Sequence, residues 1–218
     1  MLARSRTRQL FGRLVSRFET TDRVVALTFD DGPRAELADN VASVLESRRV
    51  RATFFVLGGD LVQLPGFARR LVASGHELAN HGYRNEAMVF KSSSYIRTEI
   101  EETDAAIRAA GERGEIYFRP PFGWKLVGLP LFLMRTGRTT VMWDVADSDA
   151  PLPASPEGIA SYALAKVRPG SIVLLHVWGN KASLLALPKL IDGLRSKGYA
   201  FVTVDELLRG HGGPDARQ

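Results

Sequence analysis

The sequence predicts an α/β fold, a distorted (β/α) barrel of about seven parallel strands. From residue 23 onward, short runs rich in β-branched and aromatic residues alternate with amphipathic segments of helical length. Strands that alternate with helices pair in parallel through right-handed crossovers. The 218 residues suit one domain with a full hydrophobic core. Seven candidate strands in such a chain indicate a closed or nearly closed barrel rather than a sandwich.

The candidate strands and helices follow one another along the chain. The expected strands are Val24–Phe29, Ala52–Val56, Glu77–Asn80, Ile116–Phe118, Thr139–Trp143, Ser171–Leu175 and Ala200–Thr203. The expected helices are Leu37–Leu45, Phe67–Ala73, Tyr95–Ala109, Ile159–Val167 and Leu184–Ser196. We therefore expect a barrel domain over residues 23–209, followed by a flexible tail over residues 210–218.

Residues 1–22 form a basic amphipathic segment ahead of this domain. Their apolar residues recur at helical spacing with arginines between them: Leu10, Phe11, Leu14, Val15 and Phe18. We expect a helix packed on the outside of the domain, or a helix in peripheral contact with a membrane surface. The apolar core of an export signal is missing, which favours a cytoplasmic or membrane-associated protein, and a location at the cell surface stays open as the alternative.

Composition excludes several kinds of protein. The net charge of +5 is concentrated in the first 23 residues, so the barrel itself offers no basic surface for nucleic acid. No apolar run approaches the ~18 residues of a membrane span. The chain has no cysteine, so a metal would have to bind His, Asp, Glu, Asn or water. The sequence does not indicate an oligomeric state.

Two adjacent aspartates end the first expected strand, in the stretch LTFDDGP. A turn needs only one aspartate, and two like charges at a buried strand end call for a counter-charge. Successive strand residues point to opposite faces, so Asp30 and Asp31 can have different partners. One of them could bind a cation while the other acts as a base.

Further reactive residues follow other strands. His81 and Asn85 are spaced i, i+4 in GHELANHGYRN, which suits two ligands of one metal ion. In FRPPFG, two prolines stiffen the chain around Arg119, a fixed cation that could balance Asp30. His176 follows an apolar strand, where it is either a general acid or base or a half-buried core residue. The carboxyl ends of barrel strands carry active sites, so these residues should converge.

The ordered series TFDDGP, GHE…NH, RPPFG, an aspartate cluster after WDV, and LLH resembles the five motifs of the NodB-homology polysaccharide deacetylases, carbohydrate esterase family four. The similarity covers about residues 23–209. It implies the family's distorted barrel and an activity that removes acetyl groups from N-acetylated or O-acetylated sugars with a divalent metal. Zinc is the first expectation for this metal, with cobalt, nickel or manganese as alternatives, and the implied partner is an acetylated glycan or oligosaccharide.

The resemblance also implies a role for each matching residue. Asp30 corresponds to the general base, Arg119 to the arginine that orients it, and His176 to the general acid. The metal ligands correspond to Asp31, His81 and Asn85. The Phe122 amide corresponds to an oxyanion-hole donor and Leu174 to part of the acetyl pocket. Asp149 is the best match for the aspartate that tunes the acid histidine, with Asp147 as its rival.

Two departures from the family pattern bear on function. Asn85 stands where the family has a second metal-binding histidine, and an amide oxygen is a weaker zinc ligand than imidazole. The fourth motif is irregular, since Ala146 and Ala150 replace its first aspartate and its tryptophan. Two alternatives to a metal-dependent deacetylase therefore stay open. They are a non-catalytic glycan-binding relative and a C–N hydrolase that acts on a small non-sugar amide.

Overall fold

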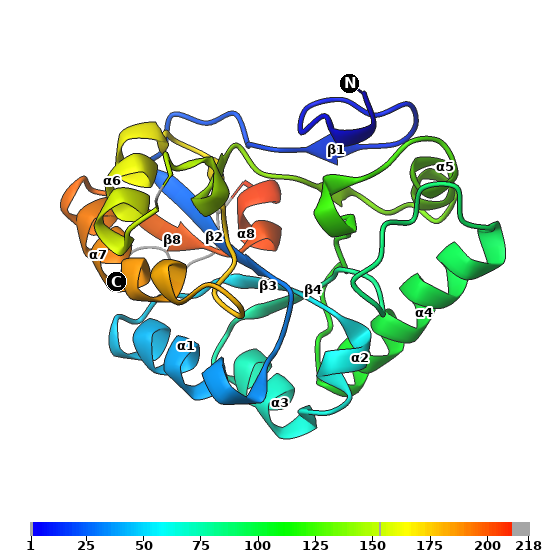
Figure 1. The fold of residues 1–218 in the computed structure, drawn as a ribbon, viewed down its shortest axis with the longest axis horizontal. Coiled ribbons are helices and arrows are strands. Elements are labelled where there is room, and N and C mark those ends of the chain that lie inside the picture. The colour runs from blue at the N-terminus through cyan, green and yellow to red at the C-terminus, as the bar shows by residue number, and fades with distance from the viewer. Residues whose placement is uncertain (1, 153, 211–218) are drawn as a thin grey trace.

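The computed structural model describes residues 2–152 and 154–210, and it shows helices arranged around a central set of parallel strands (Figure 1). The strands are β1 Leu14–Val15, β2 Val24–Asp30, β3 Thr53–Val56, β4 Glu77–Asn80, β5 Thr140–Val141, β6 Val145–Ala146, β7 Ser171–Leu175 and β8 Ala200–Val202. The α-helices are α1 Ala35–Ser47, α2 Gly58–Leu61, α3 Pro65–Ala73, α4 Ser93–Ala109, α5 Gly128–Arg135, α6 Pro156–Lys166, α7 Lys181–Ser196 and α8 Val204–Leu208. Short 3₁₀ turns are η1 Leu2–Arg4, η2 Pro121–Gly123 and η3 Asp147–Asp149.

The strands form an open path that the chain bends into a distorted barrel, as the sequence predicts. The main ladder runs β4-β3-β2-β7-β6, with β8 beside the start of β2, and all these pairs are parallel. Phe118 makes single parallel bridges to Asn80 and Thr140 and so links β4 to β5. The expected strand Ile116–Phe118 is thus reduced to one bridge residue. The tail over 211–218 lies outside the described residues.

Two apolar layers hold the barrel together. Inside it, Ala26, Phe55 and Ile172 pack with the first residues of α8, Val204 and Leu207, which close the bottom. Outside it, the opposite faces of the strands pack against α1, α3, α6 and α7 in the largest core cluster. Alternate strand residues face the two layers, which leaves the strand ends as the places where polar side chains can gather.

The prediction of an amphipathic helix in the N-terminal segment is wrong. Leu14 and Val15 form β1, which pairs in parallel with Thr140 and Val141 of β5. Leu10 and Phe11 stay exposed, because they lie in the bend that precedes β1. Burial in the sheet outweighs the weak helical periodicity of an arginine-rich segment.

Contacts near the start of the chain tie this segment to the loop after η2. The backbone N–H of Lys125 donates to the Ala3 carbonyl over 2.8 Å, and the buried Lys125 ammonium donates to the Ser5 carbonyl. Burial lowers the pKa of Lys125 to about 8. None of the helices in residues 2–152 and 154–210 is long and apolar enough to cross a membrane.

Candidate active site

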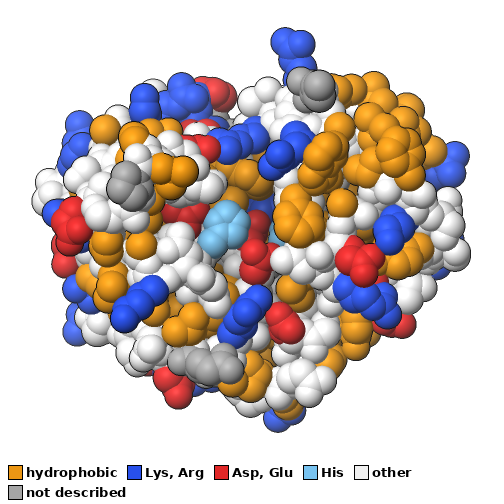
Figure 2. Space-filling view, viewed as in Figure 1, with side chains coloured by type: hydrophobic (Ala, Val, Ile, Leu, Met, Phe, Trp, Pro, Cys, Tyr) orange, Lys and Arg blue, Asp and Glu red, His pale blue; other side chains and the backbone are white. Residues whose placement is uncertain are grey.

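The carboxyl ends of the strands bring the reactive residues to one face of the barrel. Asp30 is the last residue of β2, His81 follows β4, and His176 follows β7. Residues 26 and 172 face the barrel interior, so Asp30, Leu174 and His176, an even number of positions further on, point the same way. Figure 2 shows a histidine side chain beside acidic side chains near the middle of this face.

A fully buried ion pair lies at the bottom of the site. Arg119 Nη1 donates to Asp30 Oδ1 over 2.7 Å and to the Thr28 hydroxyl over 2.8 Å. The other guanidinium nitrogens donate to the carbonyls of Val141 and Met142, each over 3.0 Å. Arg119 is 0% exposed and Asp30 3%. Because every edge of the guanidinium is bound, it fixes one oxygen of Asp30 and leaves Oδ2 for other partners.

Asp31 sits on the other side of the strand end, with a backbone that few non-glycine residues adopt. Its φ of 63° places it in the left-handed region and turns its carboxylate toward His81. Gly32 follows, where a Cβ would lie 2.4 Å from the Trp178 ring, so only glycine fits this turn. Burial raises the pKa of Asp31, but its bond to His81 and the charges of His81 and His176 outweigh burial and hold the pKa below its usual value.

His81 faces both aspartates with one ring nitrogen. Its Nε2 lies 3.5 Å from Asp31 Oδ1 and 3.9 Å from Asp30 Oδ2. Its Nδ1 lies 2.8 Å from the Arg119 carbonyl, which can only accept a hydrogen bond, so Nδ1 carries the proton. When the ring carries a single proton, the lone pair is on Nε2 and is directed toward the aspartates, whereas a second proton on Nε2 makes the ring the cation that faces Asp31. The singly protonated ring is the tautomer that a metal-binding imidazole needs.

The structure brings Asn85 to Asp31 as well, through a hydrogen bond. Asn85 Nδ2 donates to Asp31 Oδ1 over 2.8 Å, so the amide presents its donor to the carboxylate. Among the described residues, no group of three or more His, Cys, Asp or Glu side chains is arranged to hold a metal ion. Asp31 and the Nε2 lone pair of His81 fit a divalent cation. Asn85 joins them only if its amide turns to present the oxygen.

His176 is bound by Asp147, not by Asp149. Asp147 Oδ1 lies 2.9 Å from His176 Nδ1, and Asp147 Oδ2 accepts the backbone N–H of His176 over 2.7 Å. The Ser183 hydroxyl donates to the same Oδ2 over 2.5 Å. Burial disfavours the imidazolium, but the bond to Asp147 and the charge of Asp147 outweigh it and raise the pKa of His176 to about 9. At neutral pH the histidine is therefore protonated.

The prediction that Asp149 tunes His176 is wrong. Its two carboxylate oxygens each accept from Arg6 over 2.7 Å, and Oδ2 also accepts the Ala146 N–H over 3.2 Å. In the 3₁₀ turn η3, residues two apart project in different directions because there are about three residues per turn. Asp147 thus points inward to the histidine while Asp149 points to the N-terminal segment. Sequence spacing alone does not distinguish these two directions.

Phe122 and Leu174 also lie on this side of the barrel. Phe122 has a left-handed backbone, with φ 56°, within the turn that follows Arg119, and its ring is 55% exposed. Leu174 is buried on β7, where it pairs in register with Thr28. Trp178 is buried among Phe54 and Phe67 in the outer core, so it does not supply the tryptophan that the fourth motif lacks.

Sequence reasoning did not find three residues that support the site. Thr28 accepts from Arg119 and donates to the Val173 carbonyl over 2.8 Å. Ser183, near the start of α7, holds the second oxygen of Asp147. Arg6 holds Asp149 and lies over the Trp143 ring at 4.9 Å. Thr28 could have been found from the sequence, because it is a polar residue within the apolar run of β2. Nothing in the sequence around Ser183 or Arg6 indicates their contacts.

Comparisons with known proteins show the family of the chain. The family model for polysaccharide deacetylase matches residues 17–128. A chitooligosaccharide deacetylase from Rhizobium leguminosarum bv. trifolii is 34% identical and aligns with 83% of this chain and 89% of its own length. The chain spans only 30% and 39% of the length of the first curated relatives that it matches.

Two solved structures show how far the similarity extends. The Xyl-CE4 domain of a multidomain xylanase from the hindgut metagenome of Trinervitermes trinervoides superposes with a TM-score of 0.79 at 34% identity, covering 88% of this chain and 92% of that one. A CE4 family pseudoenzyme from Bacillus anthracis superposes with a TM-score of 0.78 at 28% identity, covering 89% and 68%. The fold is therefore compatible with both active and inactive sites.

Proposed function

Because this chain belongs to the polysaccharide deacetylase family, we propose that it is a hydrolase that removes acetyl groups from the N-acetylated or O-acetylated sugars of a poly- or oligosaccharide. One observation carries the proposal. The buried Asp30–Arg119 pair lies beside His81 and Asp31, and a protonated His176 held by Asp147 lies close enough for both aspartates to help raise its pKa. A base and an acid with different environments are what hydrolysis of an amide or ester requires.

A divalent metal would be held by Asp31 and His81, with Asn85 as a third and weaker ligand. Zinc is the first expectation, with cobalt, nickel and manganese as alternatives. When bound, such an ion polarises an acetyl carbonyl and lowers the pKa of a bound water. The imidazole tautomer fixed by the Arg119 carbonyl supports metal binding at this position.

Asp30 is the proposed base. Arg119 occupies Oδ1, so Oδ2 is the oxygen that takes a proton from the attacking water. The guanidinium balances the charge of the carboxylate and orients it during the step. The Phe122 amide is the proposed donor to the oxyanion that forms on the acetyl group, and Leu174 is part of the apolar pocket for its methyl group.

His176 is the proposed acid. Its Nδ1–H donates to Asp147, so Nε2–H is the proton that passes to the leaving nitrogen or oxygen. Asp147 stabilises the imidazolium before the transfer and fixes the orientation of the ring, while Ser183 and the His176 amide hold Asp147 itself. The products are acetate and a sugar with a new amine or hydroxyl group.

A non-catalytic glycan-binding function is the second candidate. The observation in its favour is the hydrogen bond from Asn85 to Asp31, which engages one of the two good ligand atoms. The intact Asp30–Arg119 and His176–Asp147 pairs favour catalysis, because a protein that only binds glycans needs neither. Hydrolysis of a small non-sugar amide uses the same residues and is distinguished by substrate alone.

Acetate release tests the proposal. The purified chain, stripped of metal and resupplied with zinc, cobalt, nickel or manganese, is incubated with an N-acetylated chito-oligosaccharide. We expect acetate release that depends on added metal and is lost in Asp30→Asn. Glycan binding without acetate release under any of these metals would favour the non-catalytic function. Acetate release from acetylated small amides but from no sugar would favour hydrolysis of a small non-sugar amide.

A further inference from the structure

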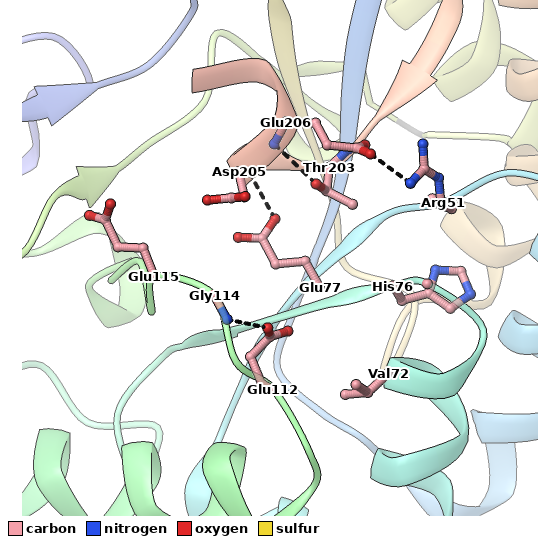
Figure 3. Close-up of a pocket in the computed structure, with 11 residues that line it drawn as sticks. Arg51, Val72, His76, Glu77, Glu112, Gly114, Glu115, Thr203, Asp205 and Glu206 are labelled. Atoms are coloured by element: carbon pink, nitrogen blue, oxygen red, sulfur yellow. Dashed lines mark hydrogen bonds and ion pairs between the residues drawn. The ribbon is translucent and has the colours of Figure 1, made fainter. Parts of the chain in front are cut away.

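A second pocket, of about 250 Å³, opens at the end of the barrel opposite the catalytic residues. Glu77 is the first residue of β4, whereas His81 follows the last residue of the same strand. The opposite wall comes from Thr203 and the first turn of α8, after the strand that pairs with the start of β2. Figure 3 shows Glu77 of β4 facing Thr203 and Asp205 across one space.

The walls of this amino-end pocket are acidic. Five of the residues that line it carry carboxyl groups, namely Glu77, Glu112, Glu115, Asp205 and Glu206. The arginine among them, Arg51, is paired with Glu206 over 2.6 Å. His76 also lines the pocket, but its Nδ1 accepts from the Ala52 N–H over 3.2 Å and burial lowers its pKa to about 4. The ring is neutral, and Asp205 is paired with Arg209 over 2.9 Å, so the negative charge of the pocket comes from Glu112 and Glu115, and from Glu77 when it is ionised.

Glu77 provides an independent sign of a ligand. It is only 6% exposed, and its Oε2 accepts from the Thr53 hydroxyl over 2.7 Å and from the Asp205 N–H over 3.1 Å. Its Oε1 is buried and has no hydrogen-bond partner among the described residues. In Figure 3 the carboxylate points from β4 into the space between Asp205, Glu115 and Glu112. A bound cationic donor would satisfy this oxygen in the ionised form of Glu77.

The charge around Glu77 agrees with a cationic donor. Burial raises the pKa of Glu77 to about 8, its two hydrogen bonds oppose this, and the neighbouring charges of Asp205 and Glu112 raise it further. A cation placed among these groups would relieve their mutual repulsion and favour the carboxylate form.

The arrangement suits an organic cation better than a metal ion. Within residues 2–152 and 154–210, no three acidic or histidine side chains are placed to hold one metal ion. The carboxyl groups instead surround a space larger than an ion and smaller than the ~300–1,000 Å³ typical of drug-sized ligands. An ammonium group donates three hydrogen bonds and accepts none, so it matches a pocket whose charged groups are nearly all acceptors.

We propose that the amino-end pocket binds a small ligand that carries a primary ammonium group, placed against Glu77 Oε1. An amino sugar is the specific class we infer, and this identification rests on the proposed function. Removal of an acetyl group from an N-acetylated sugar leaves a primary amine that is protonated at neutral pH. The deacetylated sugar therefore has the charge that this pocket recognises, and the acetylated sugar lacks it.

Titration of the full chain with glucosamine, and with N-acetylglucosamine as the neutral control, tests the proposal. Calorimetry or amide chemical shifts give the affinity. We expect glucosamine to bind and Glu77→Gln to weaken its binding by about tenfold or more, because a hydrogen bond to a charged partner is lost. Gln keeps an oxygen for Thr53 and Asp205. The exposed Glu101→Gln on α4 serves as the matched control and should bind glucosamine like the parent chain.

A second variant covers the case in which Glu77→Gln fails to fold. Glu115 is exposed at the pocket mouth, and Glu115→Gln should weaken glucosamine binding by about two- to threefold. The proposal would be overturned if N-acetylglucosamine bound as tightly as glucosamine, or if the pocket variants kept the affinity of the parent chain for glucosamine. Binding of Ca²⁺ in place of glucosamine would overturn it as well. Glu115→Gln should release acetate like the parent chain, so loss of turnover and loss of this site are measured separately.

Discussion

The carboxylate of Asp147 holds His176 at two points, through the ring Nδ1 over 2.9 Å and through the backbone N–H over 2.7 Å. The pair fixes the orientation of the ring as well as its charge. Since the pKa of His176 rises to about 9, the imidazolium is the dominant form over the neutral range. An acid that is already protonated at the start of the reaction needs only to release its proton late in it.

Replacement of Asp147 should return the pKa of His176 toward 6.5. In Asp147→Asn the bond to the ring can persist, but the negative charge that favours the imidazolium is gone. We expect the alkaline limb of the activity profile to move to lower pH and turnover near pH 8 to fall by at least about tenfold. NMR titration of His176 measures the pKa directly. The matched variant Asp149→Asn should leave the pKa of His176 unchanged, and the reverse pattern would restore Asp149 as the partner.

The same pair predicts how stability changes with pH. The folded-state pKa of His176 lies above its ordinary 6.5, so the pair contributes fully below about 6.5 and the contribution is lost as pH rises through about 9. Urea unfolding at pH 6 and pH 9.5 should therefore show a smaller difference in the free energy of unfolding for His176→Gln than for the parent chain. An identical difference in both proteins would mean that the pair does not stabilise the fold.

Replacement of Asp30 by Asn should abolish most of the turnover. Asn cannot accept the proton of the attacking water, and general base catalysis typically contributes about 10²–10⁴-fold. The variant should also melt at a lower temperature, because the buried Arg119 loses its counter-charge. Asp39→Asn, which alters an exposed ion pair with Arg70, should change neither property. Turnover within a few-fold of the parent would remove Asp30 from the role of base.

Replacement of Asn85 by His should tighten metal binding. The new imidazole would replace an amide that donates to Asp31 with a lone pair beside the same oxygen. Changes of this kind alter metal affinity or activity by about 10–100-fold. We expect tighter zinc binding and faster deacetylation when zinc is supplied, both measured against Asn85→Ala. Unchanged zinc affinity in Asn85→His would show that residue 85 does not face the metal, and tighter binding without turnover would favour the non-catalytic function.

The contact between Arg6 and Asp149 predicts that the N-terminal segment supports the site. Arg6→Ala removes a two-point, partly buried ion pair next to the turn that carries Asp147. We expect the free energy of unfolding to fall by about 1 kcal/mol and kcat to fall with little change in KM. Arg8→Ala, an exposed arginine of the same segment, is the control. Equal behaviour of the two variants would mean that the segment only covers the barrel.

The sequence predicts best the bounds of those strands that are followed by polar residues. The bounds of β4 and β7 match the expected runs, because each apolar strand is followed by polar residues that belong at a strand end. The two-residue strands β1 and β6 were missed because so short a run has no measurable periodicity. Helix α5 was missed because GLPLFLMR is largely apolar and contains Gly128 and Pro130.

The residues of the site were likewise predictable where they lie at the ends of strands. Asp30, Asp31, His81, Arg119 and His176 are placed together because parallel strands bring their carboxyl ends to one face. The choice between Asp147 and Asp149 depends on the direction of side chains within a single 3₁₀ turn, which spacing does not fix. The hydrogen bond from Asn85 to Asp31 likewise depends on the orientation of one amide.

The pairing partners of β2 have a consequence for how the chain acquires its structure. This strand lies beside β3, β7 and β8, and Val24 is in register with Ala200. The strand β2, near the start of the chain, therefore pairs with β7 and β8 near its end. These pairs join residues that are very far apart in the sequence. Such a topology slows folding. On the ribosome, the barrel cannot be completed until the residues up to Leu207 have left the exit tunnel, and until then β2 lacks its partners β7 and β8.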